Sequence, residues 1–169
     1  GRYREVYVYE PKKRLVMALN FRDRVVQSAI YLQLNPLLDN QFIYHSYGCR
    51  VGKGTTRAAD QLQYWMRMAD RKPIPWYYLK LDISKYFYRV DHKVLLGFLG
   101  KKFKGEDDLL WLMDKIINCD HTPFGLPPGL NVDDIPPSER LFEVGMPIGN
   151  LTSQLLANVC LNELDQYIK

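Results

Sequence analysis

The sequence predicts an α+β fold, in which helices and a few short strands are mixed without regular alternation. Its 169 residues are 47% hydrophobic and 25% charged, which is typical of a folded globular domain. Several segments space their apolar residues as amphipathic helices do, and two or three short runs are rich in β-branched and aromatic residues. These segments do not follow one another in the repeated βα order that builds a parallel sheet.

The composition excludes several classes of protein. The longest apolar runs are too short to span a membrane, and the first residues do not form a signal peptide. Cys49, Cys119 and Cys160 lie far apart, which argues against a disulfide framework or a zinc knuckle and suits a reducing cytoplasm. Residues 1–84 carry 14 Lys/Arg against 7 Asp/Glu, whereas residues 85–169 carry 9 against 12. Such a basic half suggests a surface for a polyanion, although on charge alone a chance asymmetry is the better interpretation.

The N-terminal part of the chain predicts a β-hairpin and a helix. Residues 3–9 and 15–19 are β-branched, aromatic or apolar, and residues 10–13 (Glu-Pro-Lys-Lys) between them are a turn signal. We therefore expect a hairpin with a cationic tip. The apolar spacing over residues 23–38 predicts an amphipathic helix that ends near Pro36.

A second helix and a strand are expected next. Residues 44–56 form a polar loop dense in Gly and cations, and Thr55 or Thr56 would cap the helix that follows. The apolar face of this helix comprises four residues, Ala58, Leu62, Trp65 and Ala69. After the helix, residues 76–83 (Trp-Tyr-Tyr-Leu-Lys-Leu-Asp-Ile) predict a strand.

The C-terminal part predicts three more helices. Two of them span about residues 92–103 and 106–119, and residues 120–140, rich in Pro, Gly and Asp, predict a long loop. A turn at 145–149 (Gly-Met-Pro-Ile-Gly) precedes the last helix, for which Asn150 or Thr152 would be the cap. The last helical pattern has no stop signal, so we expect that it continues past the end of the chain.

Asp82 is the strongest candidate for a catalytic side chain. It lies at the end of the predicted strand, and a carboxylate that emerges from a buried strand is costly unless a cation or hydrogen bonds compensate it. A lone Asp at this place would cap the next turn through Ser84. The aromatic pair Tyr86 and Phe87 favours instead a metal site beside a hydrophobic wall for a ring-bearing substrate.

Other groups carry weaker signals. The two glycines of the turn at 145–149 place backbone N–H groups beside a helix N-terminus, where a phosphate or a base can approach closely. Lys12, Lys13 and Arg14 fit either a triphosphate or a solvated turn. Residues 50–54 lack the spacing of a Walker phosphate loop, which excludes ATPase chemistry of that type.

Three long motifs together resemble those of a reverse transcriptase. Residues 80–92 (Lys-Leu-Asp-Ile-Ser-Lys-Tyr-Phe-Tyr-Arg-Val-Asp-His) are similar to the family's first catalytic motif, in the version of bacterial retroelements. Residues 44–56 resemble its fingers segment, and residues 145–161 resemble the motif around the primer and the incoming nucleotide. The motifs occur in the family's order and leave residues 120–140 unmatched.

Departures from the family pattern refine the resemblance. Most reverse transcriptases have Gln at the position of Ile148 and Pro at the position of Gln154. The Ile-Gly-x-x-x-Ser-Gln form, which includes Ser153, resembles the enzymes of diversity-generating retroelements, which copy a template RNA with errors at adenines. Group II intron, retron and defence-type reverse transcriptases are the alternatives.

The resemblance implies the fingers and palm of a right-hand polymerase, with a ferredoxin-like palm sheet. The fingers would comprise residues 1–75 and 90–150, including the loop at 120–140, and the palm would comprise residues 76–89 and 151–169. The family's Tyr-x-Asp-Asp motif, which carries its two other catalytic carboxylates, is not in this chain. We therefore expect a piece of a longer enzyme, truncated before that motif and inactive alone.

The resemblance also implies a reaction and roles for individual residues. The primer 3′-hydroxyl would attack the α-phosphate of a deoxynucleoside triphosphate with two divalent ions, Mg²⁺ or Mn²⁺. Asp82 would bridge both ions, and the carbonyl of Ile83 would bind one. Arg50 and Lys53 would hold the template backbone. The nucleotide would be bound by Lys12, Arg14, Phe87 (which would exclude a 2′-hydroxyl), Ile148 and Gly149, with Ser153 and Gln154 in the adjoining motif.

The expected partners are an RNA template, a DNA primer, deoxynucleoside triphosphates and an accessory RNA-binding protein, with no membrane. The setting would be the cytoplasm, in a bacterium or from a phage gene. Ile148 cannot make the hydrogen bonds of a Gln amide, so lower fidelity is expected. A hypothesis of another class is a non-catalytic RNA-binding module that uses the same fingers, and primer extension separates the two.

Overall fold

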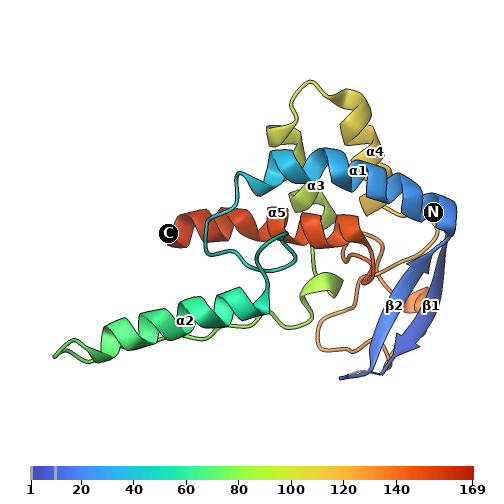
Figure 1. Ribbon diagram of the computed structural model, residues 1–169. Helices are drawn as coiled ribbons and strands as arrows, with labels where there is room; N and C mark the ends of the chain where they lie inside the picture. The colour runs from blue at the N-terminus through green and yellow to red at the C-terminus, as the bar shows by residue number, and fades with distance from the viewer. Residues whose placement is uncertain (1, 10) are drawn as a thin grey trace.

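The computed structural model describes residues 2–9 and 11–169. These residues form an α+β fold, as predicted, in the order β1 (Tyr3–Val8), β2 (Arg14–Leu19), α1 (Phe21–Asp39), α2 (Thr55–Asp70), η1 (Tyr86–Tyr88), α3 (His92–Lys102), α4 (Asp107–Ile117), η2 (Pro137–Glu139) and α5 (Leu151–Ile168), where η marks a short 3-10 helix. The helices gather in one body with the hairpin at its edge, and α2 projects from it (Figure 1).

The predicted hairpin is confirmed. β1 and β2 pair antiparallel, with Tyr3 opposite Leu19. The alternate residues Leu15, Met17 and Leu19 of β2 are buried, so one face of the hairpin packs on the rest of the chain. Glu10, which belongs to the predicted turn, lies outside the described residues.

The main core lies among α1, α3, α4 and α5. α1 packs along α5, and α3 contacts both α4 and α5 (Figure 1). The side chains of Leu38, Leu95, Leu99 and Met113 are fully buried there, as is Val159 at 1% exposure. Burial of these apolar faces stabilises the four helices against the conformational entropy of the unfolded chain.

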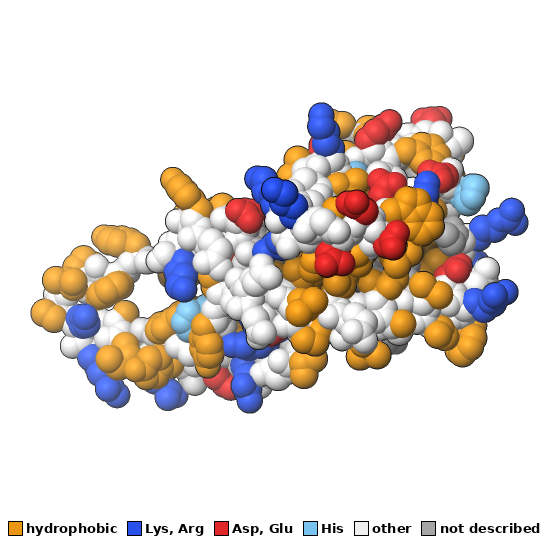
Figure 2. All heavy atoms as spheres, turned by 90° about the horizontal axis from the view of Figure 1, so that it is seen from above, with side chains coloured by type: hydrophobic (Ala, Val, Ile, Leu, Met, Phe, Trp, Pro, Cys, Tyr) orange, Lys and Arg blue, Asp and Glu red, His pale blue; other side chains and the backbone are white. Residues whose placement is uncertain are grey.

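α2 forms where the sequence predicts a helix, but its apolar face is not covered. Its N-cap position is occupied by Gly54, so the prediction of Thr55 or Thr56 as the cap is corrected by one residue. None of its residues is buried, and Leu62 and Trp65 are 53% and 44% exposed. Figure 2 shows hydrophobic side chains gathered at this end of the molecule.

The prediction of a strand at residues 76–83 was wrong. These residues are exposed and belong to no strand, and Tyr77 and Tyr78 are 90% and 88% exposed. A strand is stable only when its backbone N–H and C=O groups pair with a neighbour. Among the described residues the β1–β2 pair is the one sheet, so no ladder partner lies beside this segment. Residues 76–83, which the resemblance assigns to the palm, are therefore not part of a sheet among the described residues.

α3 and α4 agree with their predicted ranges to within two residues at each end. α1 continues through Pro36 to Asp39, so the expectation that it ends near Pro36 is corrected. Pro36 removes one backbone donor, but the extra turn buries Leu38 in the core. Asp91 caps α3 by accepting a hydrogen bond from the backbone N–H of Val94 at 2.9 Å. Residues 120–140 are irregular, as predicted, apart from η2. Asn150 occupies the N-cap position of α5, whereas Thr152 lies inside that helix. No described helix is long and apolar enough to cross a membrane.

Candidate nucleotide site

A cavity of about 720 Å³ lies between the hairpin tip, η1 and the turn before α5. Four residues assigned to the nucleotide by the sequence line it, Lys12, Arg14, Phe87 and Ile148. They come from three segments that are far apart in the chain. The fold therefore brings cations, an aromatic ring and an apolar side chain to one place.

The turn that carries Ile148 is attached to β2. The backbone N–H of Met17 donates to the carbonyl of Ile148 at 2.8 Å. Gly149 has a φ of 121°, and a Cβ there would lie 2.8 Å from Cγ1 of Val16. Glycine at this position thus permits the close approach that places Ile148 beside the hairpin.

The same turn is attached to η1 and to the loop after α4. The N–H of Gly145 donates to the carbonyl of Val90 at 2.7 Å, and that of Met146 donates to the carbonyl of Phe87 at 2.6 Å. Gly145 has a φ of 94°, and a Cβ on it would lie 2.7 Å from the backbone nitrogen of Gly125. These hydrogen bonds therefore fix the position of the turn that carries Ile148 relative to the backbone of Phe87.

Tyr86 fixes the orientation of η1. Its hydroxyl donates to the carbonyl of Ala157 in α5 at 2.8 Å, and its ring meets that of Phe87 edge to face at 5.7 Å. Burial raises the pKa of the Tyr86 phenol, so the hydroxyl remains a donor at neutral pH. Lys85, just before η1, adopts a left-handed conformation with a φ of 54° and also lines the cavity.

His92 is a supporting residue that the sequence did not reveal. Its ring is buried, with Nδ1 2.7 Å from Oδ1 of Asn118 and Nε2 2.6 Å from the carbonyl oxygen of Gly145. Since a carbonyl oxygen only accepts, Nε2 donates to it. The ring ties the turn to α3 and to the end of α4. The sequence predicts only a helix start at this position.

Asp82 lies outside this cavity. Both Asp82 and Ile83 are exposed, in the extended segment before η1. A carboxylate and a backbone carbonyl are oxygen donors of the kind that Mg²⁺ prefers. Among the described residues, however, no group of three or more His, Cys, Asp or Glu side chains is placed to hold a metal ion. Asp82 and the Ile83 carbonyl could therefore supply at most part of the ligand set of a two-ion centre.

Arg50 makes its hydrogen bonds within the chain. Its Nε and one terminal nitrogen donate to the carboxylate of Asp39 at 2.7 and 3.0 Å. Further hydrogen bonds reach the carbonyls of Asp39, Ile43 and Ser46, so all five N–H groups have partners. Its side chain is only 8% exposed, and the guanidinium lowers the pKa of the Asp39 carboxyl. This geometry fits a residue that holds the loop rather than one that contacts a template directly.

Lys53 presents a different environment. Its ammonium donates to the carbonyl of Tyr44 at 2.7 Å and lies 3.5 Å from the centre of that ring. The ring of Tyr47 lies 5.3 Å away from the same nitrogen. A hollow of about 230 Å³ is lined by aromatic and cationic side chains, which include Lys53, Tyr44, Tyr47, Arg57 and Tyr64. Aromatic rings beside cations provide surfaces for nucleic-acid bases and phosphates.

Ser153 and Gln154 occupy the first turn of α5. Ser153 is buried at 3% exposure, and Gln154 is half-buried. Neither lines the cavity at the hairpin tip. The structure thus places the two residues in the helix that supports the turn.

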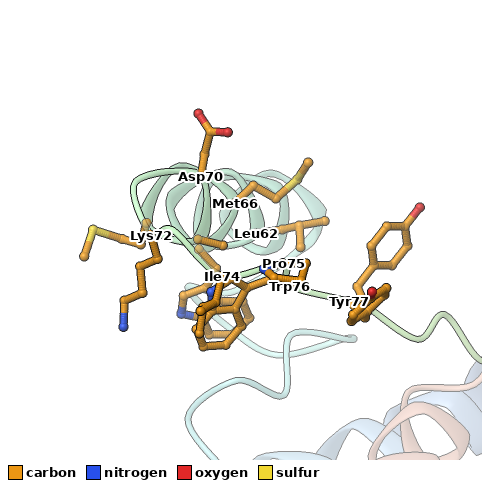
Figure 3. A pocket seen from close by; sticks show the side chains of 12 residues that line it. Leu62, Met66, Asp70, Lys72, Ile74, Pro75, Trp76 and Tyr77 are labelled. Atoms are coloured by element: carbon orange, nitrogen blue, oxygen red, sulfur yellow. The ribbon is translucent and has the colours of Figure 1, made fainter.

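A second large cavity, of about 680 Å³, lies between α2 and the segment that follows it. Figure 3 shows Ile74, Pro75 and Trp76 along one side of the helix, which carries Leu62 and Met66. Its lining is mostly apolar. None of the site residues indicated by the sequence lines it.

Comparisons with known proteins agree with the resemblance in the sequence. A family model described as reverse transcriptase (RNA-dependent DNA polymerase) matches residues 10–169. The protein YkfC of Escherichia coli is 28% identical over 147 residues, which are 87% of this chain and 35% of that protein.

Two yeast proteins are also similar. The putative COX1/OXI3 intron 2 protein of Saccharomyces cerevisiae is 25% identical over 158 residues, 89% of this chain and 16% of that protein. The uncharacterized 91 kDa protein in cob intron of Schizosaccharomyces pombe is 26% identical over 151 residues, which are 88% of this chain and 16% of that protein. The chain thus spans between 16% and 35% of the length of these relatives. Because the family model covers nearly all of it, this chain belongs to the reverse transcriptase (RNA-dependent DNA polymerase) family.

Proposed function

We propose that this chain forms the part of an RNA-directed DNA polymerase that binds the incoming deoxynucleoside triphosphate and the template. The observation that carries this proposal is the cavity that joins Lys12, Arg14, Phe87 and Ile148. Membership of the family supports the reaction class, a nucleotidyl transfer to a primer 3′-hydroxyl.

The proposed roles follow from the chemistry of the lining. Lys12 and Arg14 would neutralise the charge of the phosphates, and positioning with charge neutralisation is the main contribution of a protein to phosphoryl transfer. Phe87 offers an apolar wall, without a hydrogen-bonding partner for a sugar 2′-hydroxyl, and so favours a deoxyribose. Ile148 would lie near the nascent base pair.

Asp82 is proposed as one carboxylate ligand of the Mg²⁺ or Mn²⁺ ions that the reaction needs, with the Ile83 carbonyl beside it. Such ions would activate the hydroxyl nucleophile and stabilise charge on the phosphate. The test is primer extension on an RNA template by the whole protein. Asp82→Asn should abolish extension and leave affinity for the template nearly unchanged, whereas Asp120→Asn, which removes an exposed carboxylate elsewhere, should extend normally. Extension by Asp82→Asn at the unmodified rate would contradict the proposal.

On the template side, we propose that Lys53 and the rings of Tyr44 and Tyr47 contact the RNA, while Arg50 supports the loop that carries them. This hollow also favours a second candidate function, a non-catalytic RNA-binding module. RNA binding without primer extension by the whole protein would favour the module. The 169-residue chain itself should bind RNA and not extend a primer, because Asp82 is one carboxylate where the reaction needs several.

We further propose an error-prone enzyme of the diversity-generating kind, on the basis of Ile148 and the Ser153–Gln154 pair. An intron enzyme is the main alternative, and two of the similar proteins are described as intron proteins. A template repeat and a variable target gene beside the gene for this protein would support the first interpretation. An intron around the gene would support the second. The accessory RNA-binding partner and the cytoplasmic setting belong to the first interpretation.

A further inference from the structure

The irregular segment at residues 127–134, which we call the strap, lies beside the candidate nucleotide cavity. Lys85 donates from Nζ to the carbonyl of Leu130, and Arg89 donates to the carbonyl of Pro127 at 2.8 Å. Both cations flank η1. The family motifs quoted above leave this segment unmatched.

One ion pair joins the strap to the hairpin tip. Nζ of Lys13 lies 2.8 Å from Oδ1 of Asp133, and it also lies 4.5 Å from the centre of the Tyr7 ring. The hydrogen bond raises the pKa of Lys13 and lowers that of Asp133, so both groups are charged at neutral pH. The two side chains are 44% and 48% exposed, so the pair is accessible to an ion that competes for either partner.

The charges around the cavity are strongly asymmetric. Four cations line it: Lys12, Lys13, Arg14 and Lys85. Among the described lining residues, Asp133 is the one acidic side chain. Its carboxylate therefore lies against a cation that faces the same space as the proposed phosphate ligands. A carboxylate and a phosphate oxygen are both hydrogen-bond acceptors for an ammonium, and they compete for it.

We propose that Asp133 competes with the terminal phosphates of an incoming nucleotide for Lys13, and that this competition lowers the affinity of the cavity for a triphosphate while leaving its affinity for a monophosphate unchanged. The inference rests on the proposed function of the cavity. Lys13 thereby becomes a phosphate-binding residue, and Asp133 becomes a residue that determines specificity.

The strap does not have to open for this exchange. Val132 packs against the buried cluster that contains Leu15 and Met17 of β2, which anchors the strap on the hairpin. The carboxylate of Asp134 accepts from the N–H and the side-chain amide of Asn131, which fixes the local turn. Rotation of the Asp133 side chain alone frees Lys13. The cost of breaking the pair reduces the affinity of a ligand whose phosphates reach Lys13, whereas a monophosphate that does not reach Lys13 is unaffected.

The test measures equilibrium binding of dATP and dAMP to this chain. Asp133→Asn removes the competing charge and keeps the shape, so its affinity for dATP should rise about twofold to fivefold, the range that a surface ion pair allows. Its affinity for dAMP should not change. In the Lys13→Ala background, Asp133→Asn should have no effect on dATP. The gain should also shrink as salt screens the pair.

The matched control is Asp120→Asn. Asp120 is an exposed carboxylate that lies 3.9 Å from an exposed lysine, Lys115, and it does not line the cavity. It should leave both affinities unchanged, which separates the local competition from the change in net charge. If dATP binds and Asp133→Asn leaves its affinity unchanged, the competitor role is refuted while the proposed function stands. If neither dATP nor dAMP binds to the chain, or if dATP binds to Lys12→Ala as well as to the unmodified chain, both are overturned.

Discussion

Replacing Gly145 with Ala should destabilise the chain in two separable ways. The residue has a φ of 94°, in the left-handed region, where an Ala side chain costs about 1–2 kcal/mol. A Cβ at this position would also lie 2.7 Å from the nitrogen of Gly125 and 2.8 Å from the carbonyl carbon of Phe124. These are backbone atoms, so they cannot rotate away. Forcing such a contact costs about 1–3 kcal/mol more.

Gly105 provides the matched control. It has a φ of 91°, in the loop between α3 and α4, and a Cβ there would meet nothing within 4 Å. Gly105→Ala should therefore lose about 1–2 kcal/mol of the free energy of unfolding, from backbone strain alone. Gly145→Ala should lose about 2–5 kcal/mol when the steric cost is added. The difference between the two variants isolates the close approach of the turn to the loop after α4.

The assay is urea denaturation of the three proteins, followed by dATP binding under native conditions. Gly145→Ala should bind dATP more weakly, because its turn carries Ile148 and is hydrogen-bonded to the backbone of Phe87. Gly105→Ala should bind normally. Equal losses of stability in the two variants would refute the claim that this turn is held by a contact that only glycine permits.

Three further predictions concern single side chains. In the whole enzyme, Ile148→Gln should reduce misincorporation, because an amide can hold the nascent pair by hydrogen bonds, and an unchanged error spectrum in sequenced products would contradict this. Phe87→Ala should raise the incorporation of ribonucleotides relative to deoxyribonucleotides, measured by single-nucleotide extension, and an unchanged ratio would remove Phe87 from the sugar site. Arg50→Lys keeps the charge but loses the five-donor pattern, and should cost about 1–3 kcal/mol in urea denaturation at pH 7. Arg50 lowers the pKa of Asp39 in the folded chain relative to the unfolded chain. The ion pair therefore contributes fully to the free energy of unfolding above the ordinary pKa of a carboxyl group. This contribution is lost as the pH falls through the lower pKa of the folded chain. The difference between Arg50→Lys and the unmodified chain should thus shrink below about pH 4, and a constant difference down to pH 2 would contradict the role of the carboxylate.

Local patterns in the sequence predict the elements that bury their own apolar face. The hairpin and the helices α1, α3, α4 and α5 form where short β-branched or apolar runs, or helical spacing, predict them, and side chains such as Leu15, Leu95 and Leu99 are buried there. The segment at 76–83 shows the limit of this reasoning. Its apolar and aromatic residues have the composition of a strand, but a strand also needs a partner, and composition does not reveal whether one is present.

The candidate site could be predicted only where the resemblance assigns a role to the residue. Lys12, Arg14, Phe87 and Ile148 were indicated by the resemblance, and they meet in one cavity. The pair of Lys13 and Asp133 could not be predicted, because its partners are 120 positions apart and no motif connects them.

Arg50 illustrates a different limit, since a motif does not show which partner an arginine uses. Its sequence context suggests a template phosphate, whereas its five hydrogen bonds lie within the chain. Likewise, nothing near His92 in the sequence indicates its contact with the carbonyl of Gly145.

The cavity at the hairpin tip, rather than the mostly apolar cavity near α2, is the site that we propose binds the nucleotide. Photo-crosslinking of this chain with azido-dATP, followed by peptide mapping, tests this proposal most directly. We predict labelled peptides from residues 11–15, 85–88 or 126–133 or around Ile148, with labelling suppressed by unlabelled dATP. Labelling of the peptides that contain Met66 or Trp76, which line the other cavity, with none at the hairpin tip or Ile148, would contradict the account.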